Sequence, residues 1–281
     1  MAPSTQPPRW LELLSKPQVS QAMHKLVTLR APKPVLKTAI QGFAKIYKID
    51  LAEMAASLDD FSTFQDFFTR KLRAGARPIT SGARIVPSPA DGVLSAFGSL
   101  EASTLIQAKG VEYSLDALLG GSEDADPYRG GTYAVVYLAP NNYHRVHSPW
   151  RGTVVHWRYL PGALYPVNRM GIKHVPSLFA RNERIVGHCD TEFGRAAMVM
   201  VGATCVGHMK VAFTDLACNE GKPGSGLQPC SPMLALERGD EFGVFEMGST
   251  VVMLYARKDL EPARPLPSPV LMGEPLLRVV G

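Results

Sequence analysis

The sequence has no long uninterrupted run of apolar residues. Nowhere in its 281 residues do about 18 apolar residues follow one another, so we expect no helix that spans a membrane. The opening stretch, Met-Ala-Pro-Ser-Thr-Gln-Pro-Pro, also lacks a basic segment followed by an apolar one. We therefore expect no secretory signal peptide.

Cysteine spacing of the metal-binding kind is absent too. The chain has four cysteines, and no two of them are separated by only two residues. That spacing marks many zinc sites, and dense cysteine patterns mark disulfide-stapled secreted domains. The sequence therefore predicts neither a metal site nor a disulfide framework, and we expect reduced cytosolic thiols at Cys189, Cys205, Cys218 and Cys230.

Acidic residues are scarce at the N-terminal end. The chain carries a formal charge of +5, and this basic excess is unevenly distributed. Such an excess indicates an anionic partner, either a lipid surface or nucleic acid. In the first fifty residues Glu12 and Asp50 are the acidic residues, and the basic ones are Arg9, Lys16, Lys25, Arg30, Lys33, Lys37, Lys45 and Lys48.

Two apolar patterns with helical spacing lie in the same segment. The second follows Pro32 and Pro34 and carries lysines on its other faces. A basic amphipathic helix can lie in a membrane interface, but the pattern also fits ordinary surface helices packed on a core. The residues are Val19, Ala22, Met23, Leu26 and Val27, then Leu36, Ala39, Ile40, Phe43, Ala44 and Tyr47.

The helical pattern gives way to strands near residue 76. Ser62-Thr63-Phe64-Gln65 has the form of a capping box and predicts a short helix, and the helical pattern ends near Arg77-Pro78. Glycine, proline and β-branched residues then predominate, which is typical of many short strands. We predict an α+β fold, with N-terminal amphipathic helices in residues 1–75 and a β-rich, barrel-sandwich-like catalytic core in residues 76–281.

Two stretches of the β-rich region share the pattern S-P-x-x-G-x-[Val/Leu]. They are residues 88–94 and 148–154, where proline followed by glycine favours a tight turn between strands. Paired turns of this kind resemble the barrel-sandwich folds of biotinyl and lipoyl carrier domains. His208-Met209-Lys210-Val211 also resembles the Met-Lys-Met turn of biotinyl domains, so a carrier module is one alternative function.

A Gly-Ser step interrupts an apolar, strand-like run close to the C-terminus. Glycine leaves the Gly248 carbonyl open to approach, and the Ser249 hydroxyl adjoins it. At a strained bend this bond suits an N→O acyl shift, in which the serine oxygen displaces its own amide nitrogen. An ordinary turn at a strand kink is the alternative.

Two histidines and an aspartate offer partners for that shift. His144 and His147 are three residues apart, but their segment reads as strand and turn and has no neighbouring acidic or cysteine ligand, which argues against a metal pair. Asp91, His147 and Ser249 supply an orienting carboxylate, a base and a nucleophile. Such triads are recognised by roles and geometry rather than by chain order.

Several longer motifs lie between Phe64 and the C-terminus. They are Phe67-Phe68 with Arg70, Leu72-Arg73, Arg77-Pro78-Ile79, Ser88-Pro89-Ala90-Asp91-Gly92, Tyr143-His144-Arg145-Val146-His147, Phe179-Ala180-Arg181-Asn182-Glu183-Arg184 and Gly248-Ser249-Thr250. Together they resemble the phosphatidylserine decarboxylases of the pyruvoyl type. That family usually has leucine where this chain has Met247, a volume-conserving change that leaves the chemistry untouched.

The resemblance implies a self-processing proenzyme. Asp91 would orient His147, which would take the proton from Ser249 as its oxygen attacks the Gly248 carbonyl. The ester would then undergo β-elimination, leaving a β chain of residues 1–248 and an α chain of residues 249–281 that stay associated. Residue 249 would become a pyruvoyl group, the covalent cofactor.

The resemblance also implies a substrate and a location. The pyruvoyl ketone at position 249 would form a Schiff base with the amine of phosphatidylserine, so that CO₂ leaves and phosphatidylethanolamine forms. His144 is the candidate for reprotonating the carbon. A lipid substrate favours docking of the basic helices on an anionic membrane, at the cytoplasmic face of the cell membrane, over nucleic-acid binding. A pyruvoyl enzyme for another amino-headgroup lipid, and a homo-oligomer, both stay open.

Overall fold

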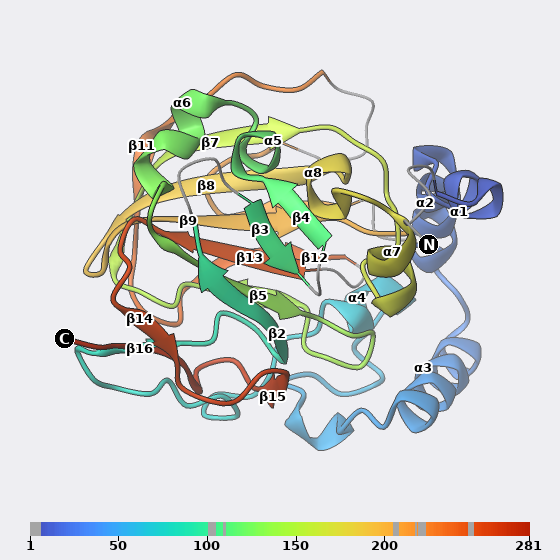
Figure 1. Cartoon of the computed structure of the whole chain (residues 1–281). Helices are drawn as coiled ribbons and strands as arrows, with labels where there is room; N and C mark the ends of the chain where they lie inside the picture. The colour runs from blue at the N-terminus through green and yellow to red at the C-terminus, as the bar shows by residue number, and fades with distance from the viewer. Residues whose placement is uncertain are drawn as a thin grey trace.

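A computed structural model describes residues 7–100, 105–108, 111–204, 208–216, 218, 223–246 and 250–281. Cys205, Met247, Gly248 and Ser249 lie outside the described residues. The described helices before the first strand are α1 (Arg9–Leu14), α2 (Pro17–Val27), α3 (Lys33–Tyr47), the short 3-10 helix η1 (Leu51–Glu53) and α4 (Phe64–Phe68) (Figure 1).

Local sequence signals explain where these helices begin. α2 and α3 each carry a proline in the first turn, where its fixed φ suits the helix and no amide donor is needed. α4 begins with a capping box one residue later than the sequence pattern suggested. Thr63 is its N-cap and exchanges hydrogen bonds with Asp66, so the pair is Thr63 and Asp66 rather than Ser62 and Gln65.

An eight-stranded antiparallel sheet forms the centre of the molecule, in the order β11-β7-β8-β9-β13-β5-β2-β15. All side chains of the central strand β13 are buried, as expected for a strand paired on both sides. The strands are β2 (Gly92–Ser99), β5 (Thr132–Tyr137), β7 (Gly152–Leu160), β8 (Arg184–Thr191), β9 (Gly194–Val201), β11 (Gln228–Leu236), β13 (Thr250–Tyr255) and β15 (Ser268–Val270).

Three smaller sheets and several short helices complete the described fold. One sheet joins β1 (Ile85–Pro87), β16 (Pro275–Val279) and β14 (Leu260–Pro262). A second joins β10 (Met209–Val211), β12 (Glu241–Phe245) and β6 (Arg145–His147), and β3 (Leu105–Ala108) pairs with β4 (Val111–Ser114). The helices are α5 (Leu115–Leu119), α6 (Ser122–Ala125), η2 (Asp126–Tyr128), α7 (Arg169–His174) and α8 (Leu178–Arg181).

The predicted α+β class is confirmed, with the strands arranged in open sheets. Within the described part of the chain the large sheet ends at β11 on one side and β15 on the other, so it does not close into a barrel. Side chains alternate between the faces of a strand, and β13 accordingly contributes to two cores. Val251 and Met253 belong to one core, whereas Val252 and Leu254 belong to the core on the other face.

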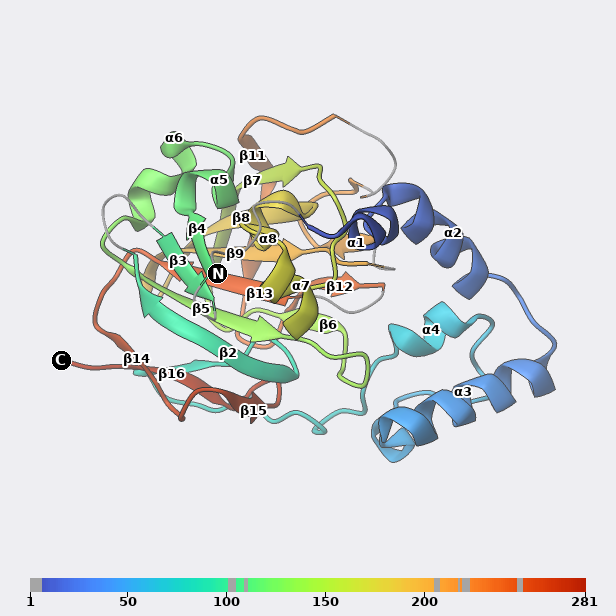
Figure 2. The same cartoon turned by 45° about the vertical axis from the view of Figure 1, so that its right-hand side comes forward.

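A third, smaller core lies in the helical region. It is built from Leu36, Ile40, Met54, Phe61 and Phe67. Figure 2 shows α2, α3 and α4 together on one side of the sheets. The division of the chain at residue 76 stays a prediction.

The two S-P-x-x-G stretches adopt matching local structures. Each connects a short strand to a strand of the large sheet, and in each the serine hydroxyl donates to the carbonyl two residues on: Ser88 to Ala90 at 2.8 Å and Ser148 to Trp150 at 2.7 Å. A Cβ on Gly92 would lie 2.4 Å from the Tyr137 carbonyl oxygen, and one on Gly152 would lie 2.5 Å from that of Asp190. Glycine is therefore required where each turn enters the sheet.

Candidate active site

The sheet brings the predicted site residues to one end of the core. Tyr137, the last residue of β5, pairs with Val93 on one side and with Thr250 on the other. Asp91 precedes β2 by one residue, and residue 249 precedes β13 by one. The turn that carries Asp91 and the start of β13 therefore lie at the same end of the sheet, separated by one strand.

The histidines reach this end through β6. Strand β6 pairs with β12, and the Phe245 amide donates to the His144 carbonyl at 2.9 Å. The His147 amide donates to the Pro89 carbonyl at 2.8 Å, which connects β6 to the turn that carries Asp91. Since β12 ends at Phe245, four residues before Ser249, His144 lies beside the last strand residue before the predicted cleavage step.

The Asp91 carboxylate binds an arginine and a backbone amide. Its Oδ2 lies 2.7 Å from Nη2 of Arg77, and its Oδ1 accepts from the Met272 amide at 2.8 Å. The Arg77 guanidinium also makes a two-oxygen contact with Glu53. Burial lowers the pKa of Arg77, but the hydrogen bonds to Asp91 and Glu53 outweigh it, so the net shift is upward. Arg77 therefore stays charged and fixes Asp91 in place.

His147 is oriented by a backbone carbonyl. Its Nδ1 lies 2.8 Å from the Gly239 carbonyl oxygen, and its Nε2 lies 3.1 Å from the Tyr143 hydroxyl. Because a carbonyl only accepts, Nδ1 carries the proton and Nε2 accepts from Tyr143. Burial lowers the pKa of His147, while the Gly239 bond and the nearby charge of Asp91 oppose that shift. The result is a neutral imidazole whose Nε2 lone pair can act as a base.

His144 is fully buried against an aromatic ring. Its centroid lies 4.1 Å from that of Phe68, and neither ring nitrogen makes a hydrogen bond to a described residue. Burial and the Arg70 guanidinium together lower the pKa of His144 to about 3. The Asn142 backbone, which is close to the ring but outside normal hydrogen-bond geometry, opposes the shift. His144 is therefore a neutral imidazole at physiological pH.

Arg70 adds an unusual buried charge beside these groups. Its side chain lies over the Phe67 ring, 5.1 Å from the centroid, and its Nε and Nη1 have no hydrogen-bond partner among the described residues. Burial lowers the pKa of Arg70, although the charges of Asp91 and Glu53 act in the opposite direction. The site thus contains two charged arginines, Arg70 and Arg77, and two neutral histidines.

A cavity of about 730 Å³ opens beside the start of β13. Thr250 lines it, and the Thr250 hydroxyl is buried without a described hydrogen-bond partner. The wall is mostly apolar, with Ser95, Asn168 and Lys173 as polar contributors besides Thr250. The other lining residues are Val93, Tyr137, Val167, Ile172, Phe179 and Pro267.

The structure places the sequence-predicted residues together only in part. His147 and Asp91 are linked through the Pro89 carbonyl, but the ring nitrogens of His147 contact Gly239 and Tyr143 instead of the Asp91 carboxylate. The Gly248 and Ser249 predictions fall outside the described residues. Sequence reasoning missed the roles of Arg77, Tyr143 and Gly239. Arg77 and Tyr143 stand in quoted motifs, Arg77-Pro78-Ile79 and Tyr143-His144-Arg145-Val146-His147, whereas Gly239 stands in none.

Lys210, the residue on which the carrier alternative depends, lies within a strand. It pairs with Val244 in the β10–β12 ladder, and its ammonium group forms an ion pair with Glu246 at 2.8 Å. A carrier lysine has to stand free at the tip of a turn. This placement does not favour the carrier alternative.

Comparisons with known proteins all identify the same family. The family model described as phosphatidylserine decarboxylase matches residues 64–278. A phosphatidylserine decarboxylase proenzyme of Myxococcus xanthus (strain DK1622) is 42% identical over 248 residues, which cover 88% of each chain. A proenzyme of the same name from Anaeromyxobacter sp. (strain K) is 44% identical over 276 residues and 95% of each chain.

A third relative with that name, from Shewanella sp. (strain MR-4), is 40% identical over 259 residues, covering 89% of this chain and 87% of its own. The family match includes α4, Asp91, both histidines and the whole of β13. This chain therefore belongs to the phosphatidylserine decarboxylase family.

Proposed function

We propose that this chain cleaves itself between Gly248 and Ser249, and that the matured protein decarboxylates phosphatidylserine to phosphatidylethanolamine. The observation that carries the proposal is the neutral, oriented imidazole of His147 on the strand beside β12. Its Nδ1–H is held by the Gly239 carbonyl, so Nε2 is the nitrogen available to take a proton. Membership in the decarboxylase family supports the same reaction.

Maturation consumes no external reagent except water. The Ser249 oxygen attacks the Gly248 carbonyl carbon while His147 Nε2 takes the hydroxyl proton, and the Gly248–Ser249 amide becomes an ester. Loss of the serine α-proton then expels Gly248 as a carboxylate and leaves dehydroalanine. Tautomerisation and hydrolysis of dehydroalanine give a pyruvoyl group and ammonia.

Residues around position 249 fit such a group. Thr250 lines the cavity, and the hydroxyl of Thr250 and both nitrogens of His144 are buried polar atoms without described partners. When formed, the pyruvoyl group supplies a ketone that captures the substrate amine and an adjacent amide that accepts electrons as CO₂ leaves. His144, which we assign to proton delivery at the reacting carbon, lies on the segment that pairs with the end of β12. Because its pKa is about 3, it would donate from the N–H of the neutral imidazole to the strongly basic carbanion.

The cavity suits a phospholipid head group. Lys173 on α7 supplies a cation for the phosphodiester, and Asn168 caps the same helix by accepting from the Met170 and Gly171 amides. The apolar wall, which includes Val167 and Phe179, suits the glycerol backbone and the first acyl carbons.

The two fragments would stay together after cleavage. Strand β13 begins the α chain, and it pairs over its whole length with β9 and β5 of the β chain. Cutting the Gly248–Ser249 bond, which precedes β13, removes none of these backbone hydrogen bonds. The sheet therefore holds the cofactor-bearing end of the α chain in place.

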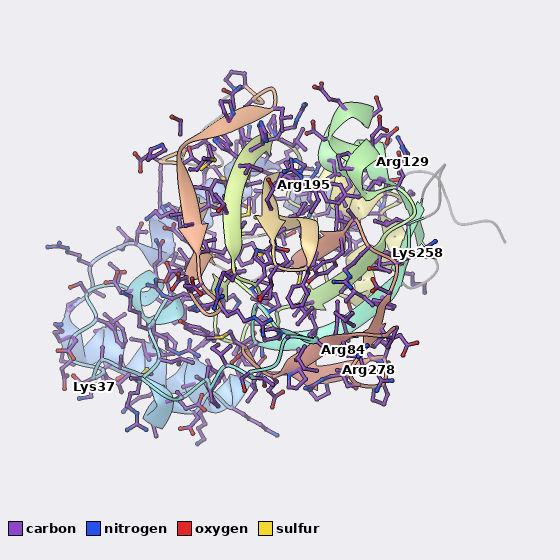
Figure 3. All side chains as sticks on the ribbon, turned by 90° about the vertical axis from the view of Figure 1, so that its left-hand side faces the viewer. Lys37, Arg84, Arg129, Arg195, Lys258 and Arg278 are labelled. Carbon is purple, nitrogen blue, oxygen red and sulfur yellow. The ribbon has the colours of Figure 1, made fainter. Side chains whose placement is uncertain are left out.

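Membrane docking forms part of the proposal. No helix among the described residues is long and apolar enough to cross a membrane. Cations occur in several parts of the molecule, since Figure 3 shows Lys37 in the helical region and Arg84 and Arg278 well apart from it. The exposed apolar side chains indicate the docking face more clearly. Among the described residues most of them lie on α1, α2 and α3 or, for Leu29, in the link between α2 and α3: Trp10, Leu13, Leu14, Leu26, Leu29, Val35, Ile46 and Tyr47.

Such side chains beside lysines are typical of segments that lie in the interface of an anionic membrane. We therefore place the protein at the surface of the cytoplasmic leaflet, with α1, α2 and α3 toward the lipid. The substrate is a component of that leaflet, so docking would bring it to the cavity without full extraction into water.

Intact mass measurement tests the maturation step. Purified protein should separate into fragments of residues 1–248 and 249–281, and the smaller one should carry a pyruvoyl group instead of an N-terminal amine. It should also release CO₂ from phosphatidylserine in vesicles. The matched control is Ser249→Ala, which should stay whole and inactive. Active wild-type protein found as one unbroken chain would falsify the proposal.

A further inference from the structure

Two histidines and a glutamate from separate segments meet beside the end of β12. His24 lies on α2, His208 directly precedes β10, and Glu246 directly follows β12. One nitrogen or oxygen atom of each lies within 4.8 Å of those of the other two. Figures 1 and 2 both show α2 on the side of the molecule where β12 ends.

The three side chains lie against one another. Nδ1 of His24 lies 3.5 Å from Oε2 of Glu246, and the rings of His24 and His208 stack with their centroids 3.7 Å apart. The Glu246 side chain is only 5% exposed, whereas that of His24 is 26% exposed. A buried carboxylate is thus faced by imidazoles that solvent can reach.

We propose that His24, His208 and Glu246 bind one divalent transition-metal ion of the Zn²⁺ class. Ligands about 2.0–2.2 Å from a tetrahedral ion stand about 3.4 Å from one another, close to the separation of His24 and Glu246. Imidazole nitrogen suits Zn²⁺, Ni²⁺ or Cu²⁺, whereas Mg²⁺ and Ca²⁺ prefer oxygen. Three protein ligands leave one coordination position for water.

Lys210 is a further group that contacts Glu246. Its Nζ lies 2.8 Å from Oε1 of Glu246, and its side chain is 69% exposed. Because His24 faces the other oxygen, Oε2, a metal bound there leaves the lysine contact in place. An ion pair alone accounts for Lys210 and Glu246. That ion pair does not involve His24 or His208, whose rings stack on each other beside the same carboxylate.

The ion would join the N-terminal helix to the core. His208 and Glu246 flank strands that pair with each other, while His24 comes from α2. An ion that binds only this docked arrangement stabilises it by mass action. It would hold α2 against the strand end three residues before Ser249. The site is separate from the proposed processing chemistry and does not depend on it.

Calorimetric titration with ZnCl₂ tests the site, using chelator-treated full-length protein without a polyhistidine tag. We expect one Zn²⁺ per chain and no binding of Mg²⁺. His24→Ala, His208→Ala and Glu246→Gln should each weaken Zn²⁺ binding by at least about tenfold, the lower range for disturbing a metal's surroundings. Lys210→Ala and the control His156→Ala, which changes a histidine outside the cluster, should bind as the wild type does.

Two results would overturn the assignment. One is a wild-type protein that binds no Zn²⁺, and the other is His24→Ala with wild-type affinity. Replacing Zn²⁺ with Co²⁺ in the wild-type protein gives a test that does not depend on any variant folding. The wild type should then show the strong visible absorption of tetrahedral Co²⁺, and a spectrum no different from that of Co²⁺ in buffer would count against the site.

Discussion

The Nδ1 atom of His147 lies 2.8 Å from the carbonyl oxygen of Gly239, a residue of the loop between β11 and β12. This contact fixes the ring in the tautomer that a base at Nε2 requires. The sequence assigned that orienting role to Asp91. In the structure the Asp91 carboxylate instead holds Arg77 and the Met272 amide, and it acts on His147 through its charge.

Asp91→Asn should therefore act mainly through Arg77. The ion pair is almost fully buried, with side chains 8% and 4% exposed, and breaking a buried pair costs roughly 3–5 kcal/mol. We expect lower stability in urea and slower self-cleavage, by less than the ~10⁴-fold loss seen when the carboxylate itself orients the histidine of a serine protease. Arg77→Gln should show a similar stability loss. A fully stable Asp91→Asn protein that never cleaves would return the orienting role to Asp91.

His147→Ala and Tyr143→Phe should behave in opposite ways. Removing the imidazole removes the base, so His147→Ala should accumulate folded, uncleaved chain on a gel. Tyr143 contacts Nε2 through its hydroxyl, and that contact has to open before Nε2 can reach Ser249. Tyr143→Phe should therefore cleave at least as fast as the wild type. Loss of cleavage in Tyr143→Phe would show that the hydroxyl takes part in the proton transfer.

His144→Ala should separate processing from turnover. General acid assistance typically contributes ~10²–10⁴-fold, so the variant should split into two chains but release CO₂ slowly from phosphatidylserine. The measurement is a gel for processing beside CO₂ release from the purified, processed variant. Full activity would remove His144 from the reaction, and an uncleaved chain would assign it to maturation.

Acid should destabilise the fold through His144. Its pKa is about 3 in the folded chain, against an ordinary value of 6.5, so between these pH values the unfolded chain binds a proton that the folded chain does not. Stability is therefore complete above pH 6.5 and falls as the pH drops below it, by up to ~1.4 kcal/mol per pH unit.

His144→Phe should lose this part of the acid sensitivity, since phenylalanine does not titrate and still packs on Phe68. Urea midpoints at pH 7 and pH 5 provide the comparison. His147 and His188, whose pKa values burial also lowers, are present in both proteins and cancel. Equal acid sensitivity of the two proteins would contradict the assignment.

Membrane docking should depend on exposed apolar residues of the helices. Leu26 and Leu29 are each 61% exposed and Ile46 is 75% exposed. Replacing the three with serine should weaken sedimentation with anionic vesicles, and added salt should weaken binding of the wild type. The matched control replaces Met233, which is 68% exposed on β11. Equal sedimentation of the triple variant and the wild type would exclude these helices as the docking face.

The sequence alone determined the features that depend on neighbouring residues. The periodic apolar pattern predicted α2, and the paired S-P-x-x-G stretches predicted two turns that the structure shows with the same serine hydrogen bond. The motifs around Asp91 and His147 identified the family. Each of these signals arises from local dihedral preferences or from functional residues that lie within a few positions of one another.

The tertiary structure decided which partners these residues meet. His147 and Gly239 are 92 positions apart, and only the pairing of β6 with β12 brings them together. The Arg77 contact with Asp91 and the meeting of His24 with Glu246 arise in the same way. Contacts of this kind depend on strand order and register, which are set by the burial of whole sheet faces. No local sequence pattern therefore predicts them.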